Sequence, residues 1–196
     1  MGVHYDGDLR RTLVRAAADD IAEHGVDGMS LRSVARRVGV SHAAPAHHFG
    51  DRVGLLTAVA VEGFHRFVAH MAGPMTAEAD PIGRLLAMSV AYAEFAEHEA
   101  GYFDVMFEPN VVRADDADYR AASDASFEAL RLAIAACQDA GWRPGHDTDA
   151  LAVAAWSFAH GVSSLRRQGS LGRIYGDGSL ADVVAVAATL VAPPPS

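Results

Sequence analysis

Apolar residues recur three and four positions apart along almost the whole chain, a spacing that places side chains on one face of an α-helix. The first such segment begins at Asp8, which is suited to capping a helix, and ends at Gly25. The alternation of apolar and polar residues that is typical of β-strands does not compete with this helical spacing in any segment. The sequence therefore predicts an all-α protein of about nine helices.

Two short helices are predicted next, each preceded by its own serine cap. Ser30 precedes the helix 31–38, which Gly39 ends, and Ser41 precedes a helix that reaches about Phe49. Glycine at the joint supplies the left-handed backbone that a tight turn between helices requires. This arrangement is typical of a helix-turn-helix, whose second helix enters the DNA major groove while the first crosses the backbone.

The remaining sequence predicts six further helices. Asp51 is expected to cap the fourth, which Gly73-Pro74 breaks, and Asp80 is expected to cap the fifth. The last four are predicted at residues 101–107, 115–140, 149–167 (opened by Asp149) and 179–192. We expect a three-helix DNA-binding domain at residues 1–52 and a larger helical domain for ligand binding and dimerisation at 53–196.

Charge is distributed unevenly along the chain, whose formal net charge is −9. Residues 1–52 hold seven arginines and seven acidic residues, so the whole negative excess lies beyond position 52. Residues 30–52 contain four arginines and a single acidic residue, Asp51. A basic patch within residues 1–52 and an acidic remainder of the chain indicate that the two parts have different partners.

Cys137 is the single cysteine, so an intrachain disulfide framework is excluded and a reducing compartment is favoured. The first residues lack the apolar segment of a signal peptide, and the longest apolar run, residues 183–192, is too short to span a bilayer. We therefore expect a cytoplasmic protein that does not associate with membranes.

Two N-terminal motifs stand out, S-L-x-x-V-A-x-x-V-G-V-S at residues 30–41 and H-F-G-D-R-x-x-L-L at residues 48–56. Together they resemble the DNA-binding domain of the TetR family. This resemblance implies a regulator that binds double-stranded DNA, with arginines on phosphates and alanine methyl groups available to thymine. The DNA-binding residues implied are Ser30, Arg32, Ser41, His42, Ala43, Ala44, His47, His48 and Arg52.

Three positions depart from the family's usual pattern. Ala46 stands where a phosphate-binding tyrosine is usual, and we expect its loss to weaken binding without altering sequence preference. Arg52 replaces a lysine and keeps the charge. Pro45 lies about four residues into the predicted recognition helix and removes a backbone donor, so we expect this helix to start irregularly.

The C-terminal half resembles a TetR subset named for a Trp-His-Gly motif, through G-Y-F-x-x-M-F at 101–107 and W-x-x-x-H-G at 156–161. The helix from 149 is apolar nearly all round, and a two-fold four-helix interface with the last helix would bury it in a homodimer. The interface residues expected are Trp156, His160, Gly161, Leu165, Val183, Val184, Ala187 and Leu190.

Aromatic and methionine side chains are also frequent in the predicted body. A stripe of such side chains more often belongs to the core than to a binding site. The resemblance nevertheless implies a pocket, and the aromatic and methionine composition suits a small apolar effector. The residues expected to line it are Phe64, Phe67, Met71, Met88, Tyr92, Phe95, Phe103, Met106, Phe107, Phe127 and Trp156.

Together these features predict a repressor that binds a pseudo-palindromic operator as a homodimer and that a small-molecule effector releases. An enzyme is the first alternative, because the chain has ten histidines. His42, His47 and His48 lack a nearby acidic or cysteine partner, however, so no catalytic residue, metal site or cofactor is predicted. A helical adaptor that has lost DNA binding is the second alternative, suggested by Pro45 and Ala46.

Overall fold

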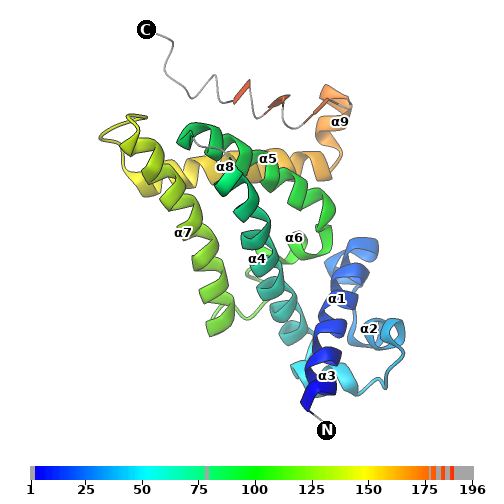
Figure 1. Ribbon diagram of the computed structural model, residues 1–196. Coiled ribbons are helices and arrows are strands. Elements are labelled where there is room, and N and C mark those ends of the chain that lie inside the picture. Colours follow the sequence, from blue (N-terminus) through cyan, green and yellow to red (C-terminus); the bar gives the residue numbers. More distant parts are fainter. Residues whose placement is uncertain (1–2, 78–79, 177, 180–181, 184–185, 188–196) are drawn as a thin grey trace. The chain divides into compact units, whose positions relative to one another are not determined.

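The computed structural model describes residues 3–77, 80–176, 178–179, 182–183 and 186–187, with the backbone alone for residues 3–6 and 77. Regular structure in these ranges is entirely helical, which confirms the predicted all-α class. None of these helices is both long and apolar enough to cross a membrane. The helices labelled in Figure 1 are α1 (Val3–Gly28), α2 (Leu31–Val38), α3 (Ala44–Phe49), α4 (Arg52–Ala77), α5 (Pro81–His98), α6 (Ala100–Met106), α7 (Ala117–Asp139), α8 (Thr148–Arg167) and α9 (Ser170–Tyr175).

Helix α1 begins at Val3, so the prediction that Asp8 caps it is wrong. Asp8 lies inside the helix, where its carboxylate contacts the Arg11 guanidinium and its carbonyl accepts a hydrogen bond from Thr12 Oγ1 (2.8 Å). Gly25 does break the helix, as predicted, because its φ of 75° and ψ of 168° are not helical. Glycine has no Cβ and adopts this conformation without steric cost.

The predicted caps of α4 and α5 are confirmed. Asp51 Oδ1 accepts a hydrogen bond from the Gly54 N–H (2.8 Å), and Asp80 Oδ2 accepts one from the Gly83 N–H (2.8 Å). The predicted break of α4 at Gly73-Pro74 is wrong, since the helix continues to Ala77. Pro74 withholds only its own N–H from the ladder, and the helix ends within one turn of it.

Two further caps lie close to the residues predicted. Asp116 caps α7, with its Oδ1 accepting from the Asp118 and Tyr119 N–H groups (3.0 and 3.1 Å). Asp147, and not Asp149, caps α8, with Oδ1 accepting from the Ala150 N–H (2.8 Å). Where several acidic residues are close in sequence, composition alone does not indicate which one adopts the extended cap conformation.

The short helix α9 was not predicted, and most of the helix predicted at 179–192 lies outside the described residues.

The chain forms two compact units, residues 1–66 with 99–124 and residues 67–98 with 125–196, called here unit 1 and unit 2. This division falls inside α4 and α7, whereas the functional boundary was predicted at residue 52. Residues 99–124, which include α6, belong to the same unit as the helix-turn-helix. The boundary at residue 52 stays a prediction about function.

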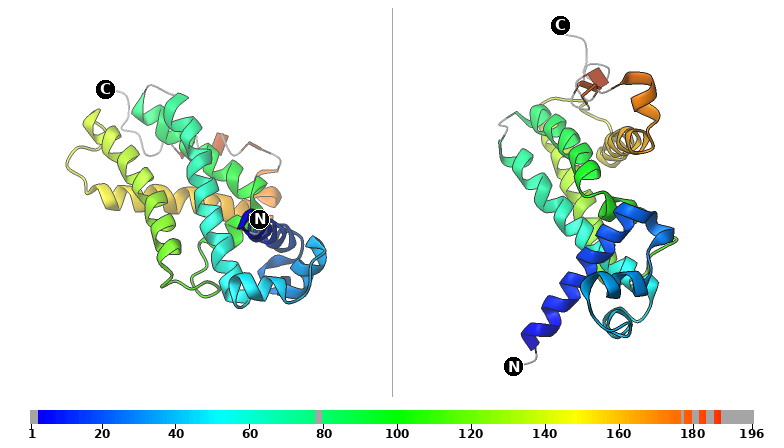
Figure 2. Two further views of the ribbon diagram at one scale, coloured as in Figure 1. Left: turned by 60° about the horizontal axis from the view of Figure 1, so that its bottom comes forward. Right: turned by 90° about the vertical axis from the view of Figure 1, so that its right-hand side faces the viewer.

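Unit 1 is organised around α1, which packs against α2, α3 and α6. Both views in Figure 2 show α1 running beside α2 and α3. Three consecutive residues of α1, Ala16 to Ala18, are buried, so this helix is covered on more than one side. The approach of α6 is closest at Gly101, where an added Cβ would lie 1.9 Å from the Ala18 carbonyl oxygen. Glycine at 101 therefore lets α6 pack against the backbone of α1.

Unit 2 contains the pair α5 and α8, which pack together. Its aromatic cluster centres on Phe67, whose ring lies 5.3 Å from the rings of both Tyr92 and Phe95 in edge-to-face geometry. Cys137 is buried, and its Sγ lies 3.2 Å from the Pro81 carbonyl oxygen as a weak hydrogen bond. The thiol therefore serves as a small core side chain.

Replacing Gly101 with alanine tests the close approach of α6 to α1. We expect the free energy of unfolding, measured by urea denaturation, to fall by about 1–3 kcal/mol because the added methyl group overpacks the junction. Gly7→Ala is the control, since a Cβ there meets no atom within 4 Å; it should raise stability by about 0.5–1 kcal/mol through helix propensity. Equal responses of the two variants would contradict the packing described.

Candidate nucleic-acid interface

Helix α2 is bounded on both sides by local hydrogen bonds. At its start, Ser30 and Ser33 form a capping box in which Ser30 Oγ accepts from the Ser33 N–H and Ser33 Oγ accepts from the Ser30 N–H (both 3.0 Å). At its end, Gly39 is left-handed (φ 76°, ψ 30°). The N–H groups of Gly39 and Val40 donate to the Arg36 and Ala35 carbonyls (3.2 and 3.0 Å), which is a Schellman motif. The predicted cap and turn are both confirmed.

Helix α3, the candidate recognition helix, begins at Ala44 and not after Ser41, so the prediction that Ser41 caps it is wrong. The Ser41 carbonyl accepts a hydrogen bond from the Ala44 N–H (3.0 Å), which makes residues 41–44 a turn. Pro45 therefore lies in the first turn, where a missing N–H costs nothing. Pro45 and Phe49 are buried. These two side chains fix which face of the short helix is turned outward.

Most of the predicted DNA-binding residues lie on the outward side of α2 and α3. Ser30, Arg32, Ser41, His42, Ala43 and His47 are exposed or half-buried, as are Ala44 and His48. The rings of His47 and His48 are 5.5 Å apart in edge-to-face geometry. Ala46 is exposed on the same helix and brings no polar group to this face. The outward side of α3 therefore combines imidazole rings with methyl groups.

Arg52 is placed differently from the other predicted residues. It is half-buried, and its guanidinium donates to two backbone carbonyls, from Nε to Met29 (3.0 Å) and from Nη2 to Val26 (2.5 Å). Val26 is among the last residues of α1, and Met29 lies in the segment that joins α1 to α2. Arg52 thus ties the start of α4 to the helix-turn-helix, and a phosphate contact would use only its remaining donors.

Two arginines on this side of unit 1 were not among the predicted residues. The first is Arg36, which is exposed one turn after Arg32 on α2. Arg32 and Arg36 form no ion pair within the described residues. The four-residue spacing of these arginines was the signal available in the sequence. Arg10 on α1 lies over the Phe49 ring, with Cζ 5.2 Å from the ring centroid, and links α1 to α3 through a cation–π contact.

The segment after α6 supports the start of α4 within the same unit. Arg113 Nη2 donates to Asp51 Oδ2 (2.9 Å), and the Arg113 N–H donates to Thr57 Oγ1 (2.9 Å). The Gly54 N–H and the Arg113 guanidinium hold the pKa of Asp51 below its ordinary value. The helix cap next to the recognition helix is therefore stabilised by a residue more than fifty positions away in sequence.

One group of potential metal ligands occurs among the described residues, formed by Asp20, Glu23 and His24. Arg37 contacts both carboxylates, and Ser33 Oγ donates to Asp20 Oδ2 (2.6 Å). A guanidinium already occupies the position that a cation would take, so this group is better described as an ion-pair network.

Two family models match the chain, one described as the bacterial regulatory proteins of the tetR family over residues 13–59 and one as the tetracyclin repressor-like C-terminal domain over residues 85–189. The chain belongs to the TetR family. It is thus a transcriptional regulator with a helix-turn-helix DNA-binding domain. The narrower likeness to the Trp-His-Gly subset stays a prediction.

Individual relatives agree with the TetR assignment. YobS of Bacillus subtilis, an uncharacterized HTH-type transcriptional regulator, is 26% identical over 98 residues, which are 50% of this chain and 51% of YobS. The class A tetracycline repressor of transposon 1721 from Escherichia coli is 45% identical over 49 residues, which are 25% of this chain and 23% of that protein. The match therefore spans only about half and a quarter of these two relatives.

Solved structures extend the likeness over the whole fold. A protein with unknown function from Rhodococcus sp. RHA1 has a TM-score of 0.79 at 31% identity, covering 93% of each chain. PfmR of Thermus thermophilus, a TetR family regulator, has a TM-score of 0.69 at 21% identity, covering 92% of this chain and 96% of PfmR. At this identity PfmR supports the fold alone.

The predicted pocket residues of this TetR protein are distributed over both units, whereas the predicted dimer residues belong to unit 2. Of the expected pocket residues, Phe64, Phe103, Met106 and Phe107 lie in unit 1, and the others lie in unit 2. His160 faces α5, because its Nδ1 lies 2.8 Å from the Tyr92 hydroxyl, and the Trp156 ring is 6.0 Å from the His160 ring. Of the expected interface residues, Val184 and Leu190 lie outside the described residues.

Replacing Arg52 with methionine keeps the aliphatic stem and removes both hydrogen bonds to the carbonyls of Val26 and Met29. We expect the free energy of unfolding to fall by about 1.5–3 kcal/mol, since each lost bond involves a charged donor. Arg36→Met removes the same charge from an exposed site and should change stability by less than about 0.5 kcal/mol. Urea denaturation of both variants measures the difference, and equal stabilities would mean that Arg52 has no structural role.

Proposed function

We propose that this TetR protein is a repressor that binds a pseudo-palindromic operator through α2 and α3 as a homodimer and is released by a small, mainly apolar effector. The observation that carries the proposal is the outward face of the helix-turn-helix. It presents Arg32 and Arg36 to solvent beside the imidazoles of α3, while the apolar residues Val34, Ala35 and Phe49 are buried. Arginine suits phosphates, and the small groove-facing side chains suit base edges.

The outward side of α8 supports a homodimer. Val153, Phe158 and Leu165 are 47%, 39% and 45% exposed, which is costly for large apolar side chains in water. At 100° per residue these side chains fall within one continuous face that also contains Ala154, Ser157 and Gly161. The smallest residue, Gly161, lies near its centre and allows a second helix to approach closely. A dimer places two recognition helices about 34 Å apart, close to one turn of DNA.

The aromatic cluster of unit 2 supports a mainly apolar effector. Phe67, Tyr92 and Phe95 form edge-to-face contacts, and the Tyr92–His160 hydrogen bond adds one polar position beside them. Burial raises the pKa of Tyr92, so its hydroxyl keeps its proton within the hydrogen bond to His160. A coupling free energy of about 1–3 kcal/mol between effector and operator would change DNA affinity roughly 5- to 150-fold.

Operator selection from random duplex DNA tests the regulatory function. We expect a palindromic sequence whose binding weakens with salt, and we expect Arg32→Ala to weaken binding and to reduce the salt slope by about one, because one phosphate contact is lost. Arg131→Ala, in α7 of unit 2, is the control and should leave both quantities unchanged. Absence of any enriched duplex would instead support an adaptor without DNA-binding activity.

Leu165→Glu tests the proposed dimer interface. A buried carboxylate without a partner should raise the dimer dissociation constant by about 10- to 100-fold, which sedimentation velocity at micromolar concentration would detect as monomer. Leu132→Glu is the matched control, because Leu132 lies on α7 and is 54% exposed. If Leu165→Glu remained as dimeric as the control, the interface would lie elsewhere.

A further inference from the structure

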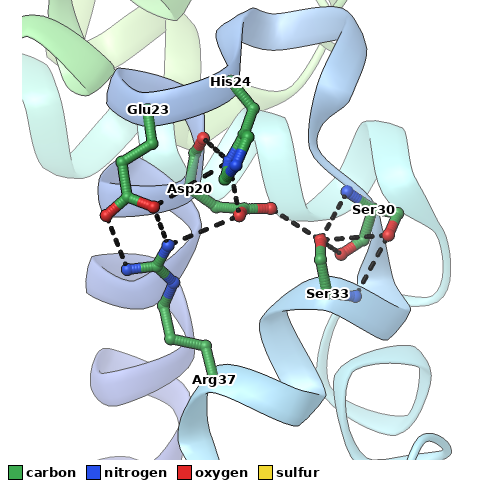
Figure 3. A network of polar contacts seen from close by, with 6 residues as sticks. All are labelled: Asp20, Glu23, His24, Ser30, Ser33 and Arg37. Carbon is green, nitrogen blue, oxygen red and sulfur yellow. Dashed lines mark hydrogen bonds and ion pairs between the residues drawn. The ribbon is translucent and has the colours of Figure 1, made fainter.

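A buried carboxylate lies beneath the first turn of α2. Asp20 belongs to α1, and its side chain is only 5% exposed. Burying a carboxylate costs free energy unless hydrogen bonds or an opposite charge satisfy it. Figure 3 shows that its partners come from α2, from Ser33 and Arg37, and from His24 on its own helix.

The hydrogen bonds of the Ser33 hydroxyl define what Asp20 does. A serine hydroxyl has one proton to donate and two lone pairs to accept with. Ser33 Oγ accepts from the Ser30 N–H and from Ser30 Oγ (both 3.0 Å), which uses both lone pairs. Its proton goes to Asp20 Oδ2 at 2.6 Å. The Ser30 carbonyl is the other nearby acceptor (2.8 Å), but the Asp20 carboxylate is charged and closer and is therefore the stronger acceptor.

Serine at this position is unusual for a capping box. The motif ordinarily uses glutamate or glutamine three residues after the cap, because the longer side chain reaches back to the cap N–H. In this chain the shorter Ser33 performs that role. Asp20 holds the Ser33 proton and so turns the lone pairs of Ser33 toward Ser30. The capping box of α2 is thereby connected to α1.

A second connection lies one turn further along α2. Arg37 Nη1 donates to Glu23 Oε1 (3.0 Å), and its Nη2 contacts Glu23 Oε2 and lies 3.6 Å from Asp20 Oδ1. The hydrogen bond from Arg37 holds the pKa of Glu23 below its ordinary value. His24 Nδ1 lies 3.2 Å from Asp20 Oδ1. Asp20 therefore contacts both turns of α2 from a single buried position on α1.

We propose that Asp20 is a positioning residue for DNA recognition, which fixes α2 on α1 through Ser33 and Arg37 and so sets the orientation of Arg32 and α3. The proposal rests on the proposed DNA-binding function. Because Asp20 is buried, it acts through these residues and contributes no phosphate contact of its own. Loss of the Asp20 side chain should weaken specific DNA binding without changing the number of salt ions that are released on binding.

The test is a double-mutant cycle with Asp20→Ala, Ser33→Glu and the two changes combined, measured as affinity for the selected operator. Asp20→Ala should weaken binding about tenfold, in keeping with coupling between residues in contact. Ser33→Glu alone should also weaken binding, because it places a second carboxylate against Asp20. The double variant should recover to within about threefold of wild type, since the introduced glutamate then forms an ordinary capping box and pairs with Arg37 four residues later.

Two further readouts separate positioning from loss of folding and from direct contact. Asp20→Ala should keep the wild-type salt slope, whereas Arg32→Ala should lower it by about one. Asp19→Ala is the matched control, since it removes the same charge from an exposed neighbouring position and should bind as wild type does. If Asp20→Ala does not fold, Asp20→Asn replaces it, keeping an oxygen acceptor for Ser33, and should bind within about threefold of wild type.

The outcomes distinguish a failure of the positioning role of Asp20 from a failure of the proposed DNA-binding function. Wild-type affinity in Asp20→Ala, strictly additive effects in the cycle, or a lowered salt slope would overturn the positioning role while leaving DNA binding intact. A wild-type protein that selects no duplex would overturn the proposed function, and the positioning role with it.

Discussion

Helix α1 is the constraint on which the rest of unit 1 depends. It packs against α2, α3 and α6, and three consecutive alanines, Ala16 to Ala18, are buried among these partners. A helix covered on several sides needs small side chains, because large ones would hold its neighbours apart. The DNA-reading elements and α6 are therefore placed against one common element, and a shift of α1 would affect all of them.

Polar contacts add orientation to this apolar packing. Arg52 binds carbonyls at the end of α1 and just after it, Arg10 lies over Phe49, and Asp20 binds the hydroxyl of Ser33. Each contact joins two different parts of the unit and involves a charged group. The contacts of Arg52 and Asp20 are hydrogen bonds to charged groups, which are stronger than those between neutral groups, and that of Arg10 is a cation–π contact. Apolar burial keeps the three N-terminal helices together, whereas these contacts limit how they slide or rotate against one another. In the proposed function, the orientation of α2 and α3 determines which side chains meet DNA.

Features that depend on neighbouring residues could be predicted from the sequence. Ser30, Asp51 and Asp80 are caps as expected, and Gly39 is left-handed, because caps and turns are determined within a few residues. The prediction that Ser41 caps α3 is wrong because a serine suits a turn as well as a cap, and Pro45, four residues later, favours a helix that starts beside it. The buried role of Asp20 and the carbonyl partners of Arg52 could not be predicted. Their partners lie 13 to 26 residues away in sequence, and helical periodicity carries no information on such pairs.

The grouping of residues 99–124 with the helix-turn-helix has a consequence for chimeric regulators. Such proteins join the DNA-binding head of one regulator to the sensor of another, and the end of the three-helix motif is the obvious place for the exchange. In this protein that cut would separate α1 from Gly101 and the Asp51 cap from Arg113. A foreign sensor would then need its own glycine and arginine in equivalent places. Exchange of the head together with α6 and the segment that follows it would carry the native junction along.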